Sequence, residues 1–114
     1  TERCNAFISI CENENVSYVI TDLRNAEKEV AEHPPCVLVC PTDIYAIRLL
    51  PVAAKYGAGI IGFDNLRLID ELGLILDSVS YDVPLTAKVA VDYIVNGTPI
   101  GDFIPCQVVK RGSV

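Results

Sequence analysis

Two aspartates stand where an apolar run gives way to polar sequence, a position typical of ligand sites in α/β proteins. Asp64 and Asn65 come directly after the run Gly-Ile-Ile-Gly-Phe, and Thr42 and Asp43 follow the earlier run Cys-Val-Leu-Val-Cys and a proline. In an open α/β sheet, ligands bind outside the carboxyl ends of the strands, where polar side chains emerge from a rigid scaffold. We therefore expect both strand ends to open onto one site.

The polar groups at these strand ends suit a ligand with several hydroxyl groups. Carboxylate and amide side chains accept from and donate to neighbouring hydroxyls, and an arginine fork can hold two oxygens at once. Arg3, at the start of the first predicted helix, is placed to be that fork, and Tyr81 is a further candidate. The predicted ligand-binding residues are Arg3, Thr42, Asp43, Asp64, Asn65 and Tyr81.

The four strand-end residues also have structural interpretations. Thr42 and Asp43 stand where a helix begins, so either side chain can cap that helix or complement its dipole. Asp64 followed by Asn65 can form an Asx turn without touching a ligand. A ligand contact is the favoured interpretation for Asp64, and a cap or turn is favoured for the other three.

Arg3 and Tyr81 have structural alternatives as well. Arg3 can form an ordinary ion pair on the helix surface. Tyr81 can be a packed cover residue. Asp82, just ahead of Pro84, is predicted to cap the helix that follows.

Patterns for cofactor binding and nucleophilic catalysis are missing from the sequence. Gly57-Ala58-Gly59 precedes a predicted strand, whereas the dinucleotide fingerprint follows one. There is no Gly-x-Ser-x-Gly motif, and the one histidine, His33, lies in a charged turn typical of the surface. A metal shared by Asp43 and Asp64, as in a phosphotransfer enzyme, is disfavoured because no phosphate-binding lysine is nearby. We expect no catalysis, no cofactor and no metal.

Length and composition indicate one domain or a piece of one. The chain has 114 residues, 51% of them hydrophobic, and a mean hydropathy of +0.36. This is more apolar surface than a small monomer can easily hide. We therefore expect a fragment whose surface is covered by a partner domain or a homodimer interface.

Charge and hydropathy also restrict the partners and the compartment. The net charge is −6 and the sequence pI is about 4.6, so no basic stripe is available for nucleic acid in this segment. The sequence shows no apolar stretch long enough for a bilayer and no export signal. The expectation is a soluble, cytoplasmic protein that does not contact membranes.

The cysteine count favours reduced thiols. Five is an odd number, and the sequences around these cysteines are apolar, which indicates core residues rather than disulfides or a zinc site. The five predicted core thiols are Cys4, Cys11, Cys36, Cys40 and Cys106.

The chain alternates predicted helices and strands with short connections. This order indicates an α/β fold with an open parallel sheet flanked by helices, of flavodoxin-like or Rossmann-like type. Pro51 falls inside one helix and predicts a kink or a break there. Helices are expected at 3–14, 26–32, 43–56, 66–72 and 84–96, and strands at 16–21, 36–40, 59–63, 77–80 and 103–110.

Several motifs, in this order and spacing, resemble the lactose-repressor/galactose-repressor (LacI/GalR) family of bacterial transcription regulators. Arg3-Cys4-Asn5-Ala6-Phe7 resembles that family's Arg-x-x-Gly-Phe helix start, and Cys40-Pro41-Thr42-Asp43 resembles its Ala-Asn-Asp strand end. The match spans nearly the whole chain. It also includes Gly62-Phe63-Asp64-Asn65, Asp77-Ser78-Val79 before helix 84–96, and the closing Val109-Lys110-Arg111-Gly112-Ser113-Val114.

The resemblance implies a periplasmic-binding-protein-like domain in which two α/β subdomains close on a sugar- or nucleoside-type effector. Residues 1–114 would be mainly the C-terminal subdomain of such a domain, and helix 84–96 would belong to the other subdomain. The resemblance also implies a homodimer. DNA would be bound only through an N-terminal helix-turn-helix domain, which this sequence does not contain.

The resemblance assigns roles residue by residue. Arg3, Thr42 and Asp64 would contact effector oxygens, Asp43 would begin the following helix, and Tyr81 would lie near the hinge between subdomains. The family usually has Asn at the position of Thr42 and often Gln at that of Tyr81, so the identity of the effector stays open. The alternative function is that of a solute-binding protein in a sugar transport system, which the five thiols disfavour.

Overall fold

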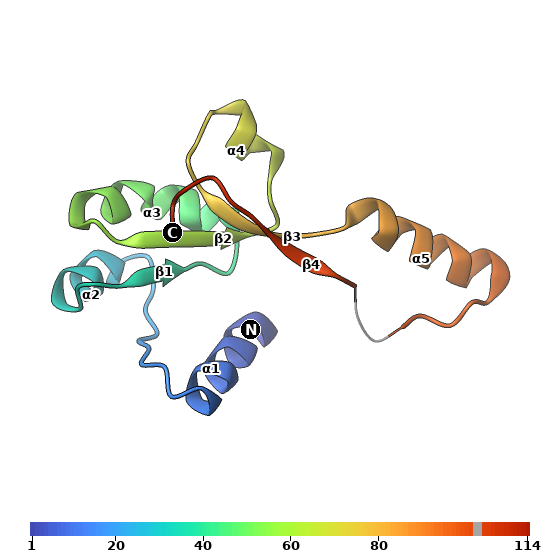
Figure 1. Cartoon of the computed structure of the whole chain (residues 1–114), viewed down its shortest axis with the longest axis horizontal. Helices are drawn as coiled ribbons and strands as arrows, with labels where there is room; N and C mark the ends of the chain where they lie inside the picture. The colour runs from blue at the N-terminus through green and yellow to red at the C-terminus, as the bar shows by residue number, and fades with distance from the viewer. Residues whose placement is uncertain (102–103) are drawn as a thin grey trace.

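A four-stranded sheet forms the centre of the molecule, in a computed structural model that describes residues 1–101 and 104–114 (Figure 1). The strand order follows the sequence, and the first three strands are parallel, which confirms the predicted open α/β sheet. The last strand is antiparallel to its neighbour, unlike the prediction. The strands are β1 (Val37–Val39), β2 (Gly59–Phe63), β3 (Asp77–Tyr81) and β4 (Cys106–Val109). The start of the predicted strand 103–110 lies outside the described residues.

The five helices of the described residues lie close to their predicted positions, and local capping signals define both ends of two of them, α3 and α5. Thr42 and Asp82 accept hydrogen bonds from backbone N–H groups of the first turns that follow them. Gly57 and Gly97 close two helices in the left-handed conformation, with φ of 64° and 66°. The helices are α1 (Glu2–Asn13), α2 (Ala26–Glu32), α3 (Asp43–Tyr56), α4 (Arg67–Glu71) and α5 (Val83–Asn96).

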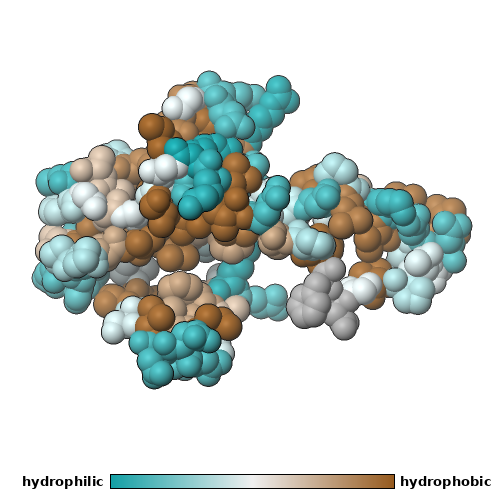
Figure 2. Space-filling view, viewed as in Figure 1, coloured by the Kyte–Doolittle hydropathy of each residue, from teal (hydrophilic) through white to brown (hydrophobic). Residues whose placement is uncertain are grey.

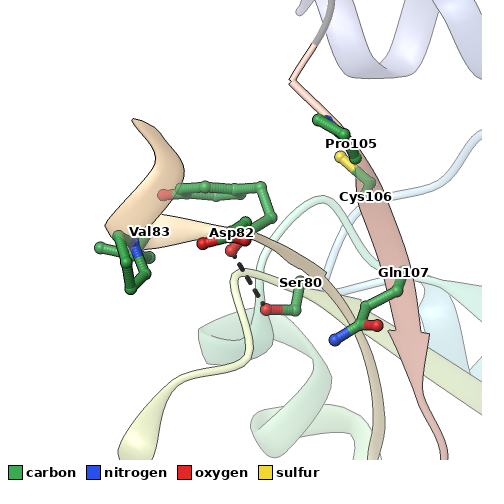
Figure 3. Close-up of a pocket in the computed structure, with 8 residues that line it drawn as sticks. Ser80, Asp82, Val83, Pro105, Cys106 and Gln107 are labelled. Carbon is green, nitrogen blue, oxygen red and sulfur yellow. Dashed lines mark hydrogen bonds between the residues drawn. The ribbon is translucent and has the colours of Figure 1, made fainter. Parts of the chain in front are cut away.

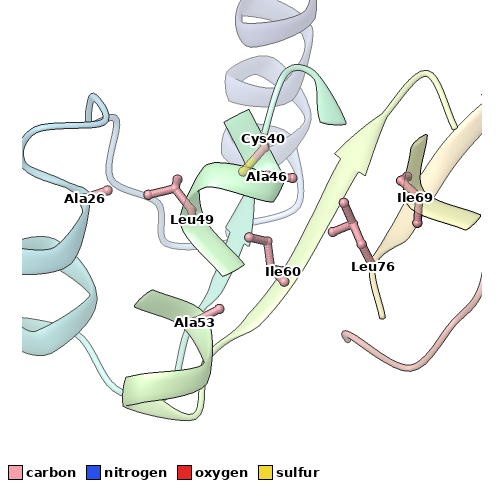
Figure 4. Close-up of a cluster of buried hydrophobic side chains, with 8 residues drawn as sticks. All are labelled: Ala26, Cys40, Ala46, Leu49, Ala53, Ile60, Ile69 and Leu76. Atoms are coloured by element: carbon pink, nitrogen blue, oxygen red, sulfur yellow. The ribbon is translucent and has the colours of Figure 1, made fainter. Parts of the chain in front are cut away.

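The hydrophobic core lies between the sheet and α3 (Figure 4). Leu38 pairs with Ile60 across β1 and β2, and alternate residues of a strand point to the same face. Each fully buried aliphatic side chain stabilises the fold by about 1.5–3 kcal/mol. This packing fixes the carboxyl ends of β1 and β2. The buried cluster contains Ala26, Cys40, Ala46, Leu49, Ala53, Ile60, Ile69 and Leu76.

The predicted strand 16–21 does not form, and this prediction is wrong. The segment is an irregular connection between α1 and α2, and Val16, Val19 and Ile20 are exposed. Its β-branched residues favour extended backbone, but a strand also needs a neighbour with free backbone groups. Within residues 1–101 and 104–114, β1 pairs only with β2, so no strand lies beside this segment.

Two helix predictions need correction. α3 continues as one helix through the exposed Pro51, so the alternative of two separate helices is wrong. The spacing of Ala6, Phe7, Ile10 and Cys11 in the sequence predicts one packed stripe on α1, but Cys11 alone of these four is buried and Ile10 is exposed. The segment after α1 supports it instead, through an edge-to-face contact between Phe7 and Tyr18.

α5 projects away from the sheet and buries none of its residues (Figure 1). Its apolar side chains form an exposed surface at one end of the molecule (Figure 2), where Ile94 is 78% exposed. The radius of gyration is 16.5 Å, whereas about 13 Å is typical of a compact domain of this size. The chain therefore leaves a large apolar area without cover.

The cysteines are all free, and two of them lie in the core as predicted. Cys11 and Cys40 are buried, but Cys106 is exposed on β4, so the prediction is wrong there. Burial, with a smaller contribution from the Asp43 carboxylate, raises the pKa of Cys40 to about 11. At neutral pH this thiol stays protonated and unreactive.

No helix in residues 1–101 and 104–114 is both long and apolar enough to cross a membrane.

Candidate functional site

The structure places Arg3 beside Asp64, although the two are 61 residues apart in the sequence. One guanidinium nitrogen of Arg3 lies 3.1 Å from a carboxylate oxygen of Asp64, and the other donates to the Pro41 carbonyl at 2.8 Å. The guanidinium also lies over the Phe63 ring, 4.8 Å from its centroid. Arg3 therefore joins the carboxyl ends of β1 and β2.

The Arg3–Asp64 ion pair remains open to solvent. The side chains are 44% and 26% exposed, respectively. Such a pair provides a cationic fork and an anionic acceptor side by side, and both can exchange water for ligand oxygens. Its geometry also fits the alternative of a surface ion pair for Arg3.

Asp64 lies in a backbone conformation that few residues other than glycine adopt. Its φ is 100° and that of Asn65 is 48°, so the chain turns sharply after β2. Positive φ costs a non-glycine residue about 1–3 kcal/mol, and residues of this kind cluster at functional sites. The Asp64 N–H donates to the Val79 carbonyl at 2.9 Å, which fixes the start of the turn to β3.

Asp43 lies beneath this turn and does not face solvent. It is 0% exposed, and its carboxylate accepts from the Ser78 hydroxyl and from the Leu66 N–H, both at 2.7 Å. Gly62 lies against this carboxylate, because a Cβ built there would be 2.2 Å from Oδ1. The geometry gives Asp43 a supporting position behind Asp64.

Thr42 and Asn65 both make local contacts. The Thr42 hydroxyl accepts from the Tyr45 N–H at 3.4 Å, as an N-cap does. The Asn65 side-chain oxygen accepts from Arg111 at 2.7 Å, so this amide points toward the C-terminal residues. Thr42 is partly buried and directly follows Pro41, whose carbonyl binds Arg3.

Tyr81 lies at a different place, at the end of β3 and two residues before α5. No hydrogen bond in the described part of the chain links Tyr81 with Arg3 or Asp64. It borders a pocket of about 400 Å³ (Figure 3), where Ser80 donates to the Tyr81 carbonyl at 3.3 Å. The pocket is lined by Ser80, Tyr81, Asp82, Val83, Pro84, Pro105, Cys106 and Gln107.

A second polar cluster holds the last residues of the chain against the sheet. Asp77 is 1% exposed, and its Oδ1 accepts from the N–H groups of Arg111, Gly112 and Ser113 at 2.5, 2.8 and 3.2 Å. The Ser113 hydroxyl donates to the Ile60 carbonyl at 2.6 Å. Burial opposes ionisation of Asp77, but these backbone donors outweigh it and hold its pKa below the usual range.

Sequence reasoning missed the roles of Ser78, Asp77 and Arg111. A serine and an aspartate within a short predicted strand are a weak signal for buried polar groups, because such residues usually face solvent. The terminal Arg-Gly-Ser was recognised only as part of a family resemblance, and its partners lie more than 30 residues away in sequence.

One group of side chains could offer metal ligands among the described residues. Ligand atoms of Glu29, Glu32 and His33, at the end of α2, lie within 4.8 Å of one another. His33 is exposed, as predicted, and its Nδ1 donates to the Glu29 carbonyl at 2.9 Å. Exposed groups of this kind are common without an ion, so we assign them no metal role.

The open α/β sheet flanked by helices defines a fold of the periplasmic-binding-protein type. The structure is similar to a LacI regulator from Lactobacillus casei with bound Tris, with a TM-score of 0.70 and 16% identity, covering 98% of this chain and 48% of that one. It is also similar to a sugar-binding LacI-family transcriptional regulator from Escherichia coli complexed with phosphate, with a TM-score of 0.52 and 19% identity, covering 68% and 32% of the two chains.

A myo-inositol binding protein from Caulobacter, bound to myo-inositol, aligns with a TM-score of 0.49 at 21% identity, over 77% of this chain and 34% of that one. No protein-family model matches the sequence, and no curated protein matches it. The chain spans about half of the L. casei structure and about a third of the E. coli structure.

At these identities the likeness is one of fold. The chain has the fold of part of a LacI-family effector domain, which confirms the predicted fold class and the fold that the sequence motifs implied. Both of these similar structures are regulators by their names, and the E. coli protein is described as sugar-binding.

Proposed function

We propose that the chain belongs to the LacI family and is the effector-sensing module of a DNA-binding transcription regulator. The observation that carries this proposal is the Arg3–Asp64 pair, held on a strained turn at the carboxyl ends of β1 and β2. The likeness to the L. casei regulator over nearly the whole chain supports it. The proposed effector is a small polyhydroxyl molecule of the sugar or nucleoside class.

In this proposal the site binds and orients its ligand without catalysis. Ligand hydroxyls would replace water on Arg3, Asp64 and Thr42, and the effector would stabilise one orientation of the two subdomains over another. The change in orientation would alter operator affinity through a helix-turn-helix domain outside this sequence. Such a regulator would act in the cytoplasm.

The largest expected effect on ligand binding comes from Asp64. In the complete protein, we expect Asp64→Ala to weaken effector binding about 10-fold or more, equivalent to about 1.4 kcal/mol, because a charged acceptor for ligand hydroxyls is lost. Isothermal titration calorimetry with free sugars, sugar phosphates and nucleosides measures this and identifies the effector class.

The control for that titration is Glu27→Ala, which removes the exposed carboxylate partner of Lys55 near the end of α3 opposite to Asp43. It should bind as the wild type does. Failure of wild-type protein to bind any of these compounds would contradict the effector proposal, and equal binding by Asp64→Ala would remove Asp64 from the site. Effector-dependent binding of operator DNA would separate a regulator from a transport solute-binding protein.

We also propose that residues 1–114 are mainly one subdomain and that α5 packs on a second one. The absence of any buried residue on α5 supports this, because an amphipathic helix gains most of its stability from packing. Pocket residues around Tyr81 would then lie at the hinge between the subdomains.

Dimerisation is proposed through α4 and the loop that follows it. Leu68, Leu72 and Ile75 expose apolar side chains there. We expect Ile75→Glu to weaken self-association of the complete protein, since it would place a charge in a dry interface. Sedimentation equilibrium measures the dissociation constant.

The control for the dimer is Ile10→Glu on α1, because Ile10 is 61% exposed and Ile75 is 63% exposed. An unchanged dissociation constant for Ile75→Glu, or an equal change for both variants, would place the interface elsewhere.

A further inference from the structure

Three hydrogen bonds to side chains hold the turn that contains Asp64. The Asn65 N–H donates to the Ser78 hydroxyl at 2.9 Å, and the Leu66 N–H donates to Asp43 at 2.7 Å. The third contact is made by a side chain, since Arg111 donates to the Asn65 oxygen at 2.7 Å. The first two bind the backbone to the sheet and α3, whereas the third depends on one long side chain.

Arg111 is nearly buried and all of its side-chain nitrogens are used. The side chain is 14% exposed. Nε and one terminal nitrogen lie 3.1 Å from the same Asp70 oxygen, and the other terminal nitrogen donates to the Leu76 carbonyl at 2.9 Å. Arg111 thus contacts the beginning, the middle and the end of the segment from Asn65 to Leu76, which connects β2 to β3 and includes α4.

We propose that Arg111 is a positioning residue for the ligand site, and that it acts through Asn65 to keep Asp64 in its left-handed conformation. That this role affects effector binding rests on the proposed function. The physical reason is that Asp64 and Asn65 each lie at positive φ, so the turn needs contacts that offset its strain. Arg111 offers a charge-assisted hydrogen bond to the residue directly after Asp64.

A guanidinium is required because its partners lie in different directions. One planar fork reaches an amide oxygen, a carboxylate and a backbone carbonyl at once. A lysine carries a single nitrogen and cannot bridge the three. Arg111→Lys should therefore keep the positive charge but no longer hold the turn at Asn65.

Amide hydrogen exchange of the complete protein, measured by NMR without ligand, tests the proposal. In Arg111→Lys we expect the Asn65 and Leu66 amides to exchange about 10-fold faster or more, because the turn opens locally. The amide of the buried Cys40, which donates to the Ile61 carbonyl at 2.9 Å, should change by less than about 2-fold, since local opening leaves this contact intact. Global destabilisation would accelerate all three amides together.

The control is Arg67→Lys, because Arg67 is 90% exposed and pairs with Glu71 on the outer side of α4. It should leave all three amides unchanged. A second variant, Asn65→Ala, removes the acceptor without touching Arg111, and Arg111→Lys should add little to it if Arg111 acts through Asn65.

Equal acceleration at all three amides, no selective change in Arg111→Lys, or additive effects of the two variants would each overturn the proposal. Since no ligand is added, these outcomes are independent of whether an effector is found.

Discussion

A Gly62→Ala variant is expected to lose about 3 kcal/mol of unfolding free energy, at the upper end of the cost of overpacking a core. The added methyl group would lie 2.2 Å from Asp43 Oδ1 and 3.1 Å from its Cα. Asp43 cannot retreat without breaking its hydrogen bonds to Ser78 and Leu66. Urea denaturation monitored by circular dichroism measures the loss.

Gly101→Ala is the control for this experiment, because no atom of the other described residues lies within 4 Å of a Cβ built at Gly101. It should change stability by less than about 0.5 kcal/mol. If Gly62→Ala were as stable as Gly101→Ala, the close packing of Asp43 beneath the turn would be wrong.

Asp77→Ala is expected to cost about 3–5 kcal/mol, because it leaves three backbone N–H donors of the C-terminal residues without their buried, charged acceptor. Asp77→Asn keeps one acceptor oxygen but loses the charge, and we expect a smaller loss at pH 7. Thermal unfolding of both variants at neutral pH provides the comparison.

The same carboxylate predicts how stability changes with pH. Its folded-state pKa lies below its ordinary value of 3.8. Ionised Asp77 therefore contributes stability above that value, and the contribution is lost as the pH falls through the folded-state pKa. Wild-type protein should lose more stability than Asp77→Asn below about pH 4. Asp92→Asn, on the exposed α5, should behave like the wild type, and parallel pH curves for all three would contradict this role for Asp77.

Elements with their own start and stop signals could be predicted from the sequence. Helix α3 has Thr42 before it, which caps the helix as predicted, and Gly57 after it, which ends the helix in the left-handed conformation. The segment 16–21 failed because its composition favours extended backbone but says nothing about whether a partner strand exists. Strand pairing is decided by residues far away in the sequence.

The candidate site shows the same division. The positions of Asp64 and Thr42 after apolar runs could be read from the sequence, and the structure places both at the carboxyl ends of strands. The burial of Asp43 and the contact between Asn65 and Arg111 could not, because they depend on side chains that meet across 35 and 46 residues. A local sequence pattern does not show which residues far apart in the chain come into contact.

Different residues support the Asp64 turn and would contact the ligand, so the affinity for a ligand and the choice of ligand can be changed independently. Residues that would touch the ligand lie on one side of the turn, and Asp43, Ser78 and Arg111 lie on the other. Substitutions on the rear side change how well the turn is held without altering the atoms offered to the ligand. In a biosensor built on this module, substitutions at the supporting residues would therefore shift the working concentration range. The ligand-contacting residues would set which molecule is detected.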